Sequence, residues 1–269
     1  MLYIVGAGPG DPGLLTLRGA ELLRAADVVI YAGSLVNPAL LDLTKPGCQL
    51  HNSAGMTLDE IVAVVGRSHR AGQTVVRLSS GDPSLYGAVR EQIDRCRDLG
   101  IPLEVVPGVS SLGAAAAALG VQYTLPGVSQ TLILTRLAGR TPVPDAESLA
   151  ALAGHQASMA IFLSVHRIER VVAQLRAAYP AETPVAVVYK ASWPEQEIVR
   201  GTLGDIAAAV KDRGITKTAL IVVGGFLGDD YELSRLYNPA FSHGCRTAKP
   251  AQGQTPAAGP AAGSAGERR

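Results

Sequence analysis

The stretch LYIVGAGPGDPG, residues 2–13, decides how the rest of the chain is interpreted. Apolar residues at Leu2–Val5 run directly into a turn rich in glycine and proline, which is typical of a buried strand that ends in a loop. Thr16 then precedes the helical pattern Leu17–Ala25, and a second apolar strand is expected at Val28–Tyr31. Strands separated by helices of this length predict a mainly parallel sheet that is covered on both faces.

Two later strands of the first half are expected to end in loops of the same kind. The strand Thr74–Leu78 runs into SSGDP at residues 79–83, and the strand Leu103–Val106 runs into PGVSS at residues 107–111. A helix is predicted between them, from about Tyr86 to Leu99. The carboxyl ends of parallel strands meet at one edge of a sheet, where open α/β folds bind ligands. Loops of glycine and proline present backbone groups with little charge, which favours a large polar ligand of low net charge.

A second alternation of strands and helices follows residues 122–128, which we interpret as a linker. The strand predicted at Glu197–Arg200 follows the strand at Val185–Tyr189 after a short turn, so part of the second sheet should be antiparallel. The predicted fold class is therefore α/β, with a first domain at residues 1–121, a second at residues 129–245 and a cleft between them.

Composition excludes several classes of protein. The formal net charge is only +1, from 24 Lys and Arg against 23 Asp and Glu, so no basic excess exists to neutralise a nucleic acid. The longest mainly apolar stretch, Leu112–Val121, is half of the roughly 20 residues that a membrane helix needs. Met1 leads directly into the first strand without the features of a signal peptide, so we expect a cytoplasmic protein. Residues 246–269 are expected to form a disordered tail, because 13 of the 21 residues at 249–269 are Ala, Gly or Pro.

No metal site is predicted. The three cysteines lie far apart in the sequence, which excludes a disulfide framework and a Cys-x-x-Cys zinc pair. The five histidines show no i, i+4 pairing beside a carboxylate, so a metal centre would have to be assembled from scattered residues.

The first glycine-rich turn fits none of the common nucleotide-binding motifs. The dinucleotide fingerprint GxGxxG needs a third glycine where Asp11 stands. A P-loop needs lysine followed by serine or threonine where residues 14–15 are both leucine. Gly6, Gly8 and Gly10 do satisfy the GxGxG turn of the common Rossmann-type methyltransferases, but their strand does not begin near an acidic residue. An isolated turn of this kind could serve close chain packing alone; the two similar loops favour a ligand site.

Together, the glycine-rich loops resemble the signatures of the tetrapyrrole (corrin/porphyrin) methylase superfamily, whose members use S-adenosylmethionine. The resemblance covers about residues 2–245 and is carried by VGAGPGDP at residues 5–12, RLSSGDP at residues 77–83 and VPGVSS at residues 106–111. Within the superfamily, QTLILTR at residues 130–136 and GRTPVP at residues 139–144 are similar to the precorrin-4 C(11)-methyltransferases of cobalamin (vitamin B12) biosynthesis.

This resemblance implies two α/β domains, a homodimer, and methylation of carbon 11 of precorrin-4 to give precorrin-5. The methyl donor would be S-adenosylmethionine, with S-adenosylhomocysteine as the second product. Two alternatives stay open: the cobalt-containing precorrin-4 of the anaerobic pathway as the substrate, and a tetrapyrrole carrier or sensor without catalytic activity. Methyl transfer from a sulfonium needs no metal and no nucleophilic side chain, only close positioning and exclusion of water.

The resemblance also implies which residues bind the cofactor. Carried over position by position, they are Pro9, Ser80, Gly81, Asp82, Leu85, Ser110, Ser111, Leu163, Tyr189, Ala191, Thr218 and Ala219. Ser80 stands where many relatives have glycine and Leu163 where many have methionine, and neither change removes a needed backbone contact.

Substrate contacts are expected on Gly8, Gly10 and Asp11, because the family associates the first loop with the tetrapyrrole side of the cleft. Asp11 either faces the substrate or orders this loop. The substrate carries many carboxylates, and Arg136 and Arg140, which leave the end of a predicted strand, are the best candidates to bind them through paired hydrogen bonds.

A general base would assist the reaction, since the acceptor carbon becomes nucleophilic as a proton leaves. Asp82 is the acid nearest the implied cofactor and is the candidate catalytic residue. The alternative role for Asp82 is that of a turn residue that caps the following helix. Arg77 lies inside a strand pattern, where we expect a structural ion pair.

Overall fold

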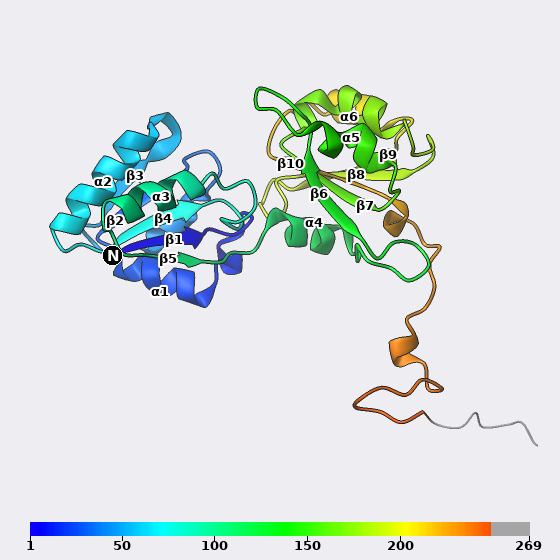
Figure 1. Ribbon diagram of the computed structural model, residues 1–269, viewed down its shortest axis with the longest axis horizontal. Helices are drawn as coiled ribbons and strands as arrows, with labels where there is room; N and C mark the ends of the chain where they lie inside the picture. The colour runs from blue at the N-terminus through cyan, green and yellow to red at the C-terminus, as the bar shows by residue number, and fades with distance from the viewer. Residues whose placement is uncertain (249–269) are drawn as a thin grey trace, which may run out of the picture. The chain divides into compact units, whose positions relative to one another are not determined.

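The computed structural model describes residues 1–248, and it groups residues 1–231 into one compact unit and the residues from Glu232 onward into another. The first unit contains two five-stranded sheets, each with helices packed against it (Figure 1). Among the residues that the structure describes, no helix combines the length and the apolar character needed to cross a membrane.

The first sheet is entirely parallel, as the alternation of strands and helices predicts. Its strands stand in the order β3-β2-β4-β1-β5. Central strand β1 pairs with β4 from Leu2 opposite Val75, and with β5 from Leu2 opposite Leu103. The strands are β1 (Leu2–Gly6), β2 (Val28–Tyr31), β3 (Gln49–Asn52), β4 (Val75–Ser79) and β5 (Leu103–Val106).

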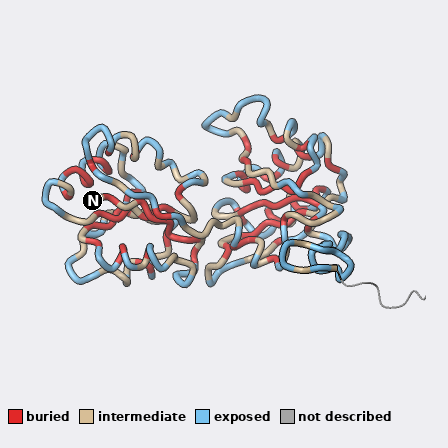
Figure 2. Tube along the Cα trace, turned by 60° about the horizontal axis from the view of Figure 1, so that its bottom comes forward, coloured by how far each residue is buried: buried red, intermediate tan, exposed pale blue. Residues whose placement is uncertain are grey.

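Helices cover both faces of this sheet because alternate strand residues are apolar on each face. Leu22 and Leu23 of α1 (Leu17–Ala25) pack on one face, in a cluster with Val5 and Val29 of the strands. The other face carries α2 (Leu58–Arg70) and α3 (Arg90–Asp98). Figure 2 shows the buried residues concentrated along the strands.

The second sheet is mixed, which confirms the expectation of partly antiparallel pairing. Its order is β6-β7-β10-β8-β9; β6 and β7 are parallel, and the remaining pairs are antiparallel. The strands are β6 (Leu132–Arg136), β7 (Ser158–Phe162), β8 (Pro184–Tyr189), β9 (Glu197–Thr202) and β10 (Ala219–Val223).

The two faces of the second sheet are covered by helices from different parts of the chain. One face packs against α5 (Leu149–Ala153), α6 (Ile168–Leu175) and α7 (Ile206–Asp212). The other face carries α4 (Ser111–Leu119), whose Ala114 and Ala115 are buried against it. Small alanine side chains let α4 lie close to this sheet, although α4 directly follows the last strand of the first sheet.

Helix ends are fixed by the residues that the sequence indicates. Thr16 Oγ1 accepts a hydrogen bond from Gly19 N at 3.1 Å at the start of α1. Thr57 and Glu60 form a reciprocal capping box at the start of α2. Gly120 ends α4 with a left-handed φ of 69°.

The elements differ from the sequence prediction in several places, including α3 and β3. The helix predicted from Tyr86 begins only at Arg90, because Tyr86 and Ala88 have left-handed φ angles of 55° and 49°. Strand β3 was not expected, since Gln49, His51 and Asn52 are polar. It is an edge strand with mostly exposed residues, so no apolar pattern marks it.

The second unit is described from Glu232 to Ala248. It contains a short 3-10 helix, Arg235–Tyr237, and the Arg246 side chain donates hydrogen bonds to the carbonyl oxygens of Leu236 and Asn238 at 2.6 and 2.8 Å. Of the predicted disordered tail, residues 249–269 lie outside the described residues. The domain boundaries expected at residues 121 and 129 stay a prediction.

Candidate functional site

The glycine-rich loops that follow β1, β4 and β5 lie against one another at the carboxyl edge of the first sheet. Gly8 N donates to the Gly81 carbonyl oxygen at 3.2 Å, and Gly81 N donates to the Gly8 carbonyl oxygen at 2.8 Å. An added Cβ on Gly6 would lie 2.5 Å from Gly108 Cα, so the first and third loops touch backbone to backbone. The loops therefore meet as the parallel strand order predicts.

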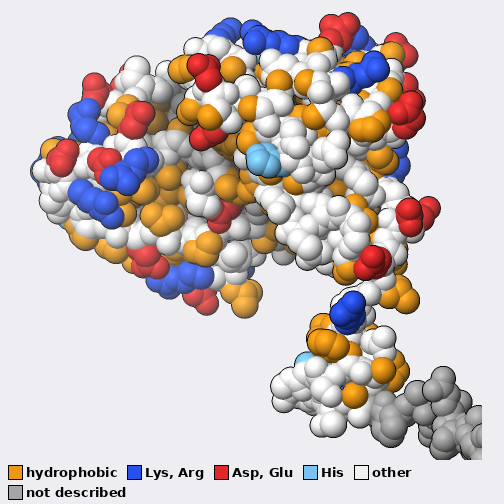
Figure 3. All heavy atoms as spheres, turned by 45° about the vertical axis from the view of Figure 1, so that its right-hand side comes forward, with side chains coloured by type: hydrophobic (Ala, Val, Ile, Leu, Met, Phe, Trp, Pro, Cys, Tyr) orange, Lys and Arg blue, Asp and Glu red, His pale blue; other side chains and the backbone are white. Residues whose placement is uncertain are grey.

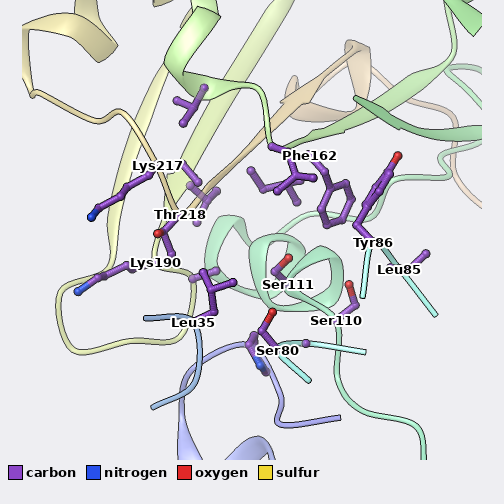
Figure 4. A pocket seen from close by; sticks show the side chains of 18 of the residues that line it. Leu35, Ser80, Leu85, Tyr86, Ser110, Ser111, Phe162, Lys190, Lys217 and Thr218 are labelled. Carbon is purple, nitrogen blue, oxygen red and sulfur yellow. The ribbon is translucent and has the colours of Figure 1, made fainter. Parts of the chain in front are cut away.

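A pocket of about 400 Å³ opens beside these loops, and its wall comes from both sheets (Figure 4). Figure 4 shows Ser80, Ser110 and Ser111 on the side of the first sheet, and Thr218 and Lys190 on the side of the second. The predicted cofactor residues that line it are Pro9, Ser80, Gly81, Asp82, Leu85, Ser110, Ser111, Leu163, Ala191, Thr218 and Ala219.

Tyr189 is the member of the predicted set that lies outside the pocket lining. Successive residues of a strand point to opposite faces of a sheet. Val188 therefore lines the pocket, whereas Tyr189 packs against the hydrophobic cluster on the other face of the second sheet.

Apolar side chains make up much of the rest of the wall. Leu35, Leu163 and Val165 contribute aliphatic surface, and the Tyr86 ring packs on the Phe162 ring with their centroids 5.3 Å apart. Burial raises the pKa of the Tyr86 hydroxyl, while Arg136 lowers it and Glu147 raises it by smaller amounts, so Tyr86 is neutral at pH 7. A partly apolar wall with hydroxyl and backbone groups suits a large ligand with few charges.

Asp82 joins the second loop to the third. One carboxylate oxygen accepts hydrogen bonds from Ser84 N (2.8 Å) and from Ser84 Oγ, and the other accepts one from Gly108 N at 2.8 Å. Burial raises the pKa of Asp82, but the hydrogen bonds from Ser84 and Gly108 outweigh it and leave the pKa below its usual value. These contacts fit the turn role better than that of a base, because a low pKa makes a weak base.

The residues assigned to the tetrapyrrole lie outside the lining of this pocket. Asp11 Oδ1 accepts a hydrogen bond from Gly13 N at 2.8 Å, which orders the first loop. Gly8 bonds to Gly81, and Gly10 lies against the ring of Trp193.

Arg136 and Arg140 are also absent from the pocket lining. The Arg136 guanidinium donates to the carbonyl oxygens of Thr141 and Pro142 at 3.2 and 2.8 Å and so shapes its own loop. Arg140 is exposed. Arg77 is structural as expected, but its partners are Gln92 Oε1 at 3.1 Å and backbone carbonyls rather than a carboxylate.

Sequence reasoning missed several residues of the lining. Lys190 and Trp193 come from the loop between β8 and β9, and Leu35 comes from the loop after β2. Trp193 carried a usable signal, because it is the only tryptophan of the chain and stands beside Pro194 in a turn. Lys, Arg, Asp and Glu side chains are interspersed on the face that Figure 3 shows.

Comparisons with known proteins agree with this arrangement. Residues 1–207 match the model of the family "Tetrapyrrole (Corrin/Porphyrin) Methylases". A cobalt-precorrin-4 C(11)-methyltransferase of Methanocaldococcus jannaschii is 55% identical over 90% of this chain and 94% of that protein. A precorrin-4 C(11)-methyltransferase of Pseudomonas aeruginosa is 51% identical over 90% of this chain and 97% of that protein.

Solved structures show the same fold. The X-ray structure of a cobalt precorrin-4 methyltransferase superposes with a TM-score of 0.83 at 47% identity, covering 85% of this chain and 96% of that one. A uroporphyrin-III C-methyltransferase of Thermus thermophilus in complex with S-adenosylhomocysteine has a TM-score of 0.72 at 32% identity, covering 84% of this chain and 98% of that one. This chain therefore belongs to the tetrapyrrole (corrin/porphyrin) methylase family.

Proposed function

We propose that this chain is an S-adenosylmethionine-dependent methyltransferase that methylates carbon 11 of precorrin-4, giving precorrin-5 in cobalamin biosynthesis. The observation that carries the proposal is the identity of 55% and 51% to two C(11)-methyltransferases over 90% of the chain. The pocket at the carboxyl edge of the first sheet supports it independently, because this edge is where an α/β fold binds a large ligand.

The pocket residues fit S-adenosylmethionine. A volume of about 400 Å³ lies within the roughly 300–1,000 Å³ range of small-molecule sites. Gly81 leaves its backbone open to the pocket, since the nearest atom to an added Cβ is 3.8 Å away. The predicted cofactor set, apart from Tyr189, supplies hydroxyl and backbone groups for the polar parts of this ligand and aliphatic surface for its base.

The bound cofactor supplies a methyl group on a sulfonium centre, which a nucleophilic carbon can displace directly. The chain's contribution is then to hold both reactants at near-attack distance and to exclude water. We assign Asp82 to the first task, because its carboxylate ties the second loop to Gly108 of the third. The first loop, with Gly8, Gly10 and Asp11, would form the tetrapyrrole side. Of the two predicted arginines, Arg140 is the exposed one and would bind a substrate carboxylate.

Cobalt-precorrin-4 is the second candidate substrate, because the relative at 55% identity carries that name. Metal-free and cobalt-containing rings present similar carboxylates, so the same site would accept either. We propose no metal of the protein's own for the reaction.

We further propose a homodimer in the cytoplasm. The dimer is the assembly that the family resemblance implies, and sedimentation velocity of the purified chain would test it. The cytoplasm agrees with the free thiols of Cys48, Cys96 and Cys245, because disulfides are rare in that reducing compartment.

The decisive experiment incubates the purified protein with methyl-labelled S-adenosylmethionine and precorrin-4, with and without cobalt in the ring. Label in precorrin-5 at carbon 11 is the expected result. Label in the cobalt-containing ring alone would favour the second substrate. Tight tetrapyrrole binding without label in either ring would show that the chain is a tetrapyrrole carrier and not an enzyme.

A further inference from the structure

The loop between β8 and β9 holds the first glycine-rich loop through Trp193. The indole Nε1–H donates a hydrogen bond to the Pro9 carbonyl oxygen at 2.8 Å. Next to it, Asp11 N donates to Ser192 Oγ at 3.0 Å. Both bonds join residues more than 180 positions apart in the sequence, and both connect the first sheet's loop to the second sheet's loop.

Gly10 is the position that makes room for this contact. An added Cβ would lie 2.0 Å from Cδ1 and 2.1 Å from Nε1 of Trp193, so the indole ring occupies the space of a side chain. Asn37 Nδ2 also donates to the Gly10 carbonyl oxygen at 2.9 Å. The backbone of Gly10 is therefore held by contacts with both Trp193 and Asn37.

The holding loop is itself tightly ordered. Lys190 and Ser192 have left-handed φ angles of 44° and 68°, a costly conformation that persists only where surrounding contacts impose it. Ser192 N donates to Gln196 Oε1 at 2.8 Å. Lys190 Nζ lies 5.1 Å from the centre of the Trp193 ring, and its ion pair with Glu195 measures 3.5 Å.

We propose that Trp193 is a positioning residue that couples the two ligand sites of the methyltransferase. Pro9 and Trp193 both line the cofactor pocket, whereas Gly10 and Asp11 continue the loop on the side assigned to the tetrapyrrole. One indole therefore sets the distance between methyl donor and acceptor, and a displacement of about 1 Å costs such reactions roughly a hundredfold in rate. The inference rests on the proposed function for the identity of the two ligands.

Trp193→Phe tests the coupling, because it keeps an aromatic ring in this loop and removes the donor to Pro9 together with part of the ring surface beside Gly10. We expect kcat to fall roughly tenfold to a hundredfold, while S-adenosylhomocysteine affinity, measured by calorimetry, falls only about two- to tenfold. Tyr179→Phe is the matched control: it removes an aromatic hydroxyl that donates to the Ala157 carbonyl oxygen in the core of the second sheet. It should lower Tm and leave kcat and ligand affinity unchanged.

The single tryptophan also gives a direct spectroscopic readout. Titrating the wild-type protein with S-adenosylhomocysteine should change the tryptophan emission, with the same Kd as calorimetry gives. In the ligand-free protein, hydrogen exchange at Asp11 N should be faster in Trp193→Phe than in wild type.

Unchanged emission on saturation, or a Trp193→Phe variant with wild-type kcat and wild-type exchange at Asp11, would overturn the role of Trp193. A wild-type protein that binds no S-adenosylhomocysteine would count against the proposed function instead, and the exchange comparison would still decide whether Trp193 holds the loop.

Discussion

At the scale of single residues, backbone proximity decides which side chains the site tolerates. The loops after β1, β4 and β5 touch through glycines, and Gly81 combines a left-handed φ of 61° with a place in the pocket wall. A side chain at this position has two separate costs, one for the fold and one for the ligand.

Gly81→Ala should lower the free energy of unfolding by about 1–2 kcal/mol, because alanine is strained at positive φ. It should also weaken S-adenosylhomocysteine binding about tenfold or more, since a methyl group is added to the wall. Gly47→Ala is the control, with a φ of 82°, open space around it and no part in the pocket lining. Gly47→Ala should lose the same stability in a thermal melt and should bind S-adenosylhomocysteine with wild-type affinity in calorimetry. Equal ligand affinities of the two variants would show that Gly81 does not belong to the site.

The carboxyl groups of Asp82 and Asp27 should make the free energy of unfolding depend on pH. Hydrogen bonds from Lys45 and from Thr74 N hold the pKa of Asp27 below its usual value. For Asp82 burial raises the pKa, but bonds from Ser84 and Gly108 outweigh burial and lower it. A carboxyl group whose pKa is lower in the folded state stabilises the fold at neutral pH, and this contribution disappears as the pH falls through the folded pKa.

Asp27→Asn and Asp82→Asn should therefore each unfold more easily than wild type at pH 7, by about 1 kcal/mol, and the difference should disappear as the pH falls through the lowered pKa of each folded carboxyl group. Urea titrations at several pH values measure it. Only Asp82→Asn should weaken S-adenosylhomocysteine binding. A kcat loss of several orders of magnitude with unchanged cofactor affinity would instead establish Asp82 as the general base.

At the scale of secondary-structure elements, local capping signals were enough to predict α1, α2 and α4. Where a signal was absent or misleading, the prediction failed for a physical reason. Polar β3 lies at an edge, so its pairing depends on β2 and not on its own pattern. Tyr86 looked helical, yet it turns left-handed to place its ring on Phe162, a contact that only the second sheet supplies.

Thr57→Ala should destabilise the protein by about 1 kcal/mol, because it removes one half of the capping box that starts α2. Thr57→Ser keeps the hydroxyl and should retain most of the stability. Differential scanning calorimetry compares the two, and both variants should bind S-adenosylhomocysteine normally, since α2 contributes nothing to the pocket lining. Equal melting temperatures for the two variants would mean that the cap contributes nothing measurable.

At the scale of the whole first unit, the pocket belongs to both sheets. The family resemblance identified 11 of the residues that line the pocket, among them those of the glycine-rich loops, because close backbone contacts in these loops restrict the residue types. The substrate role of the two arginines stays a prediction: Arg136 bonds to the carbonyls of its own loop, a local conformation that no sequence motif indicates. Trp193 was missed because its role depends on a contact with Gly10, far away in the sequence.

Hydrogen exchange with and without S-adenosylhomocysteine should show that the ligand contacts segments from both halves of the chain. We expect slower exchange in residues 107–111 of the first half and in residues 216–220 of the second, because both segments contribute to the pocket lining. Exchange in α7 should stay the same, since it packs on the far face of the second sheet. Protection confined to one half of the chain would contradict a ligand held between the two sheets.

The order of the strands also has a consequence for synthesis on the ribosome. Strand β1 emerges first, yet its neighbours in the sheet begin pairing only at Val75 and Leu103, and the pocket wall is complete only with Leu220. At roughly 5–20 residues per second, translation to that point takes about 10–45 s. During this time no nascent chain can bind the ligand, so the ligand cannot assist early folding and can stabilise only the nearly finished protein.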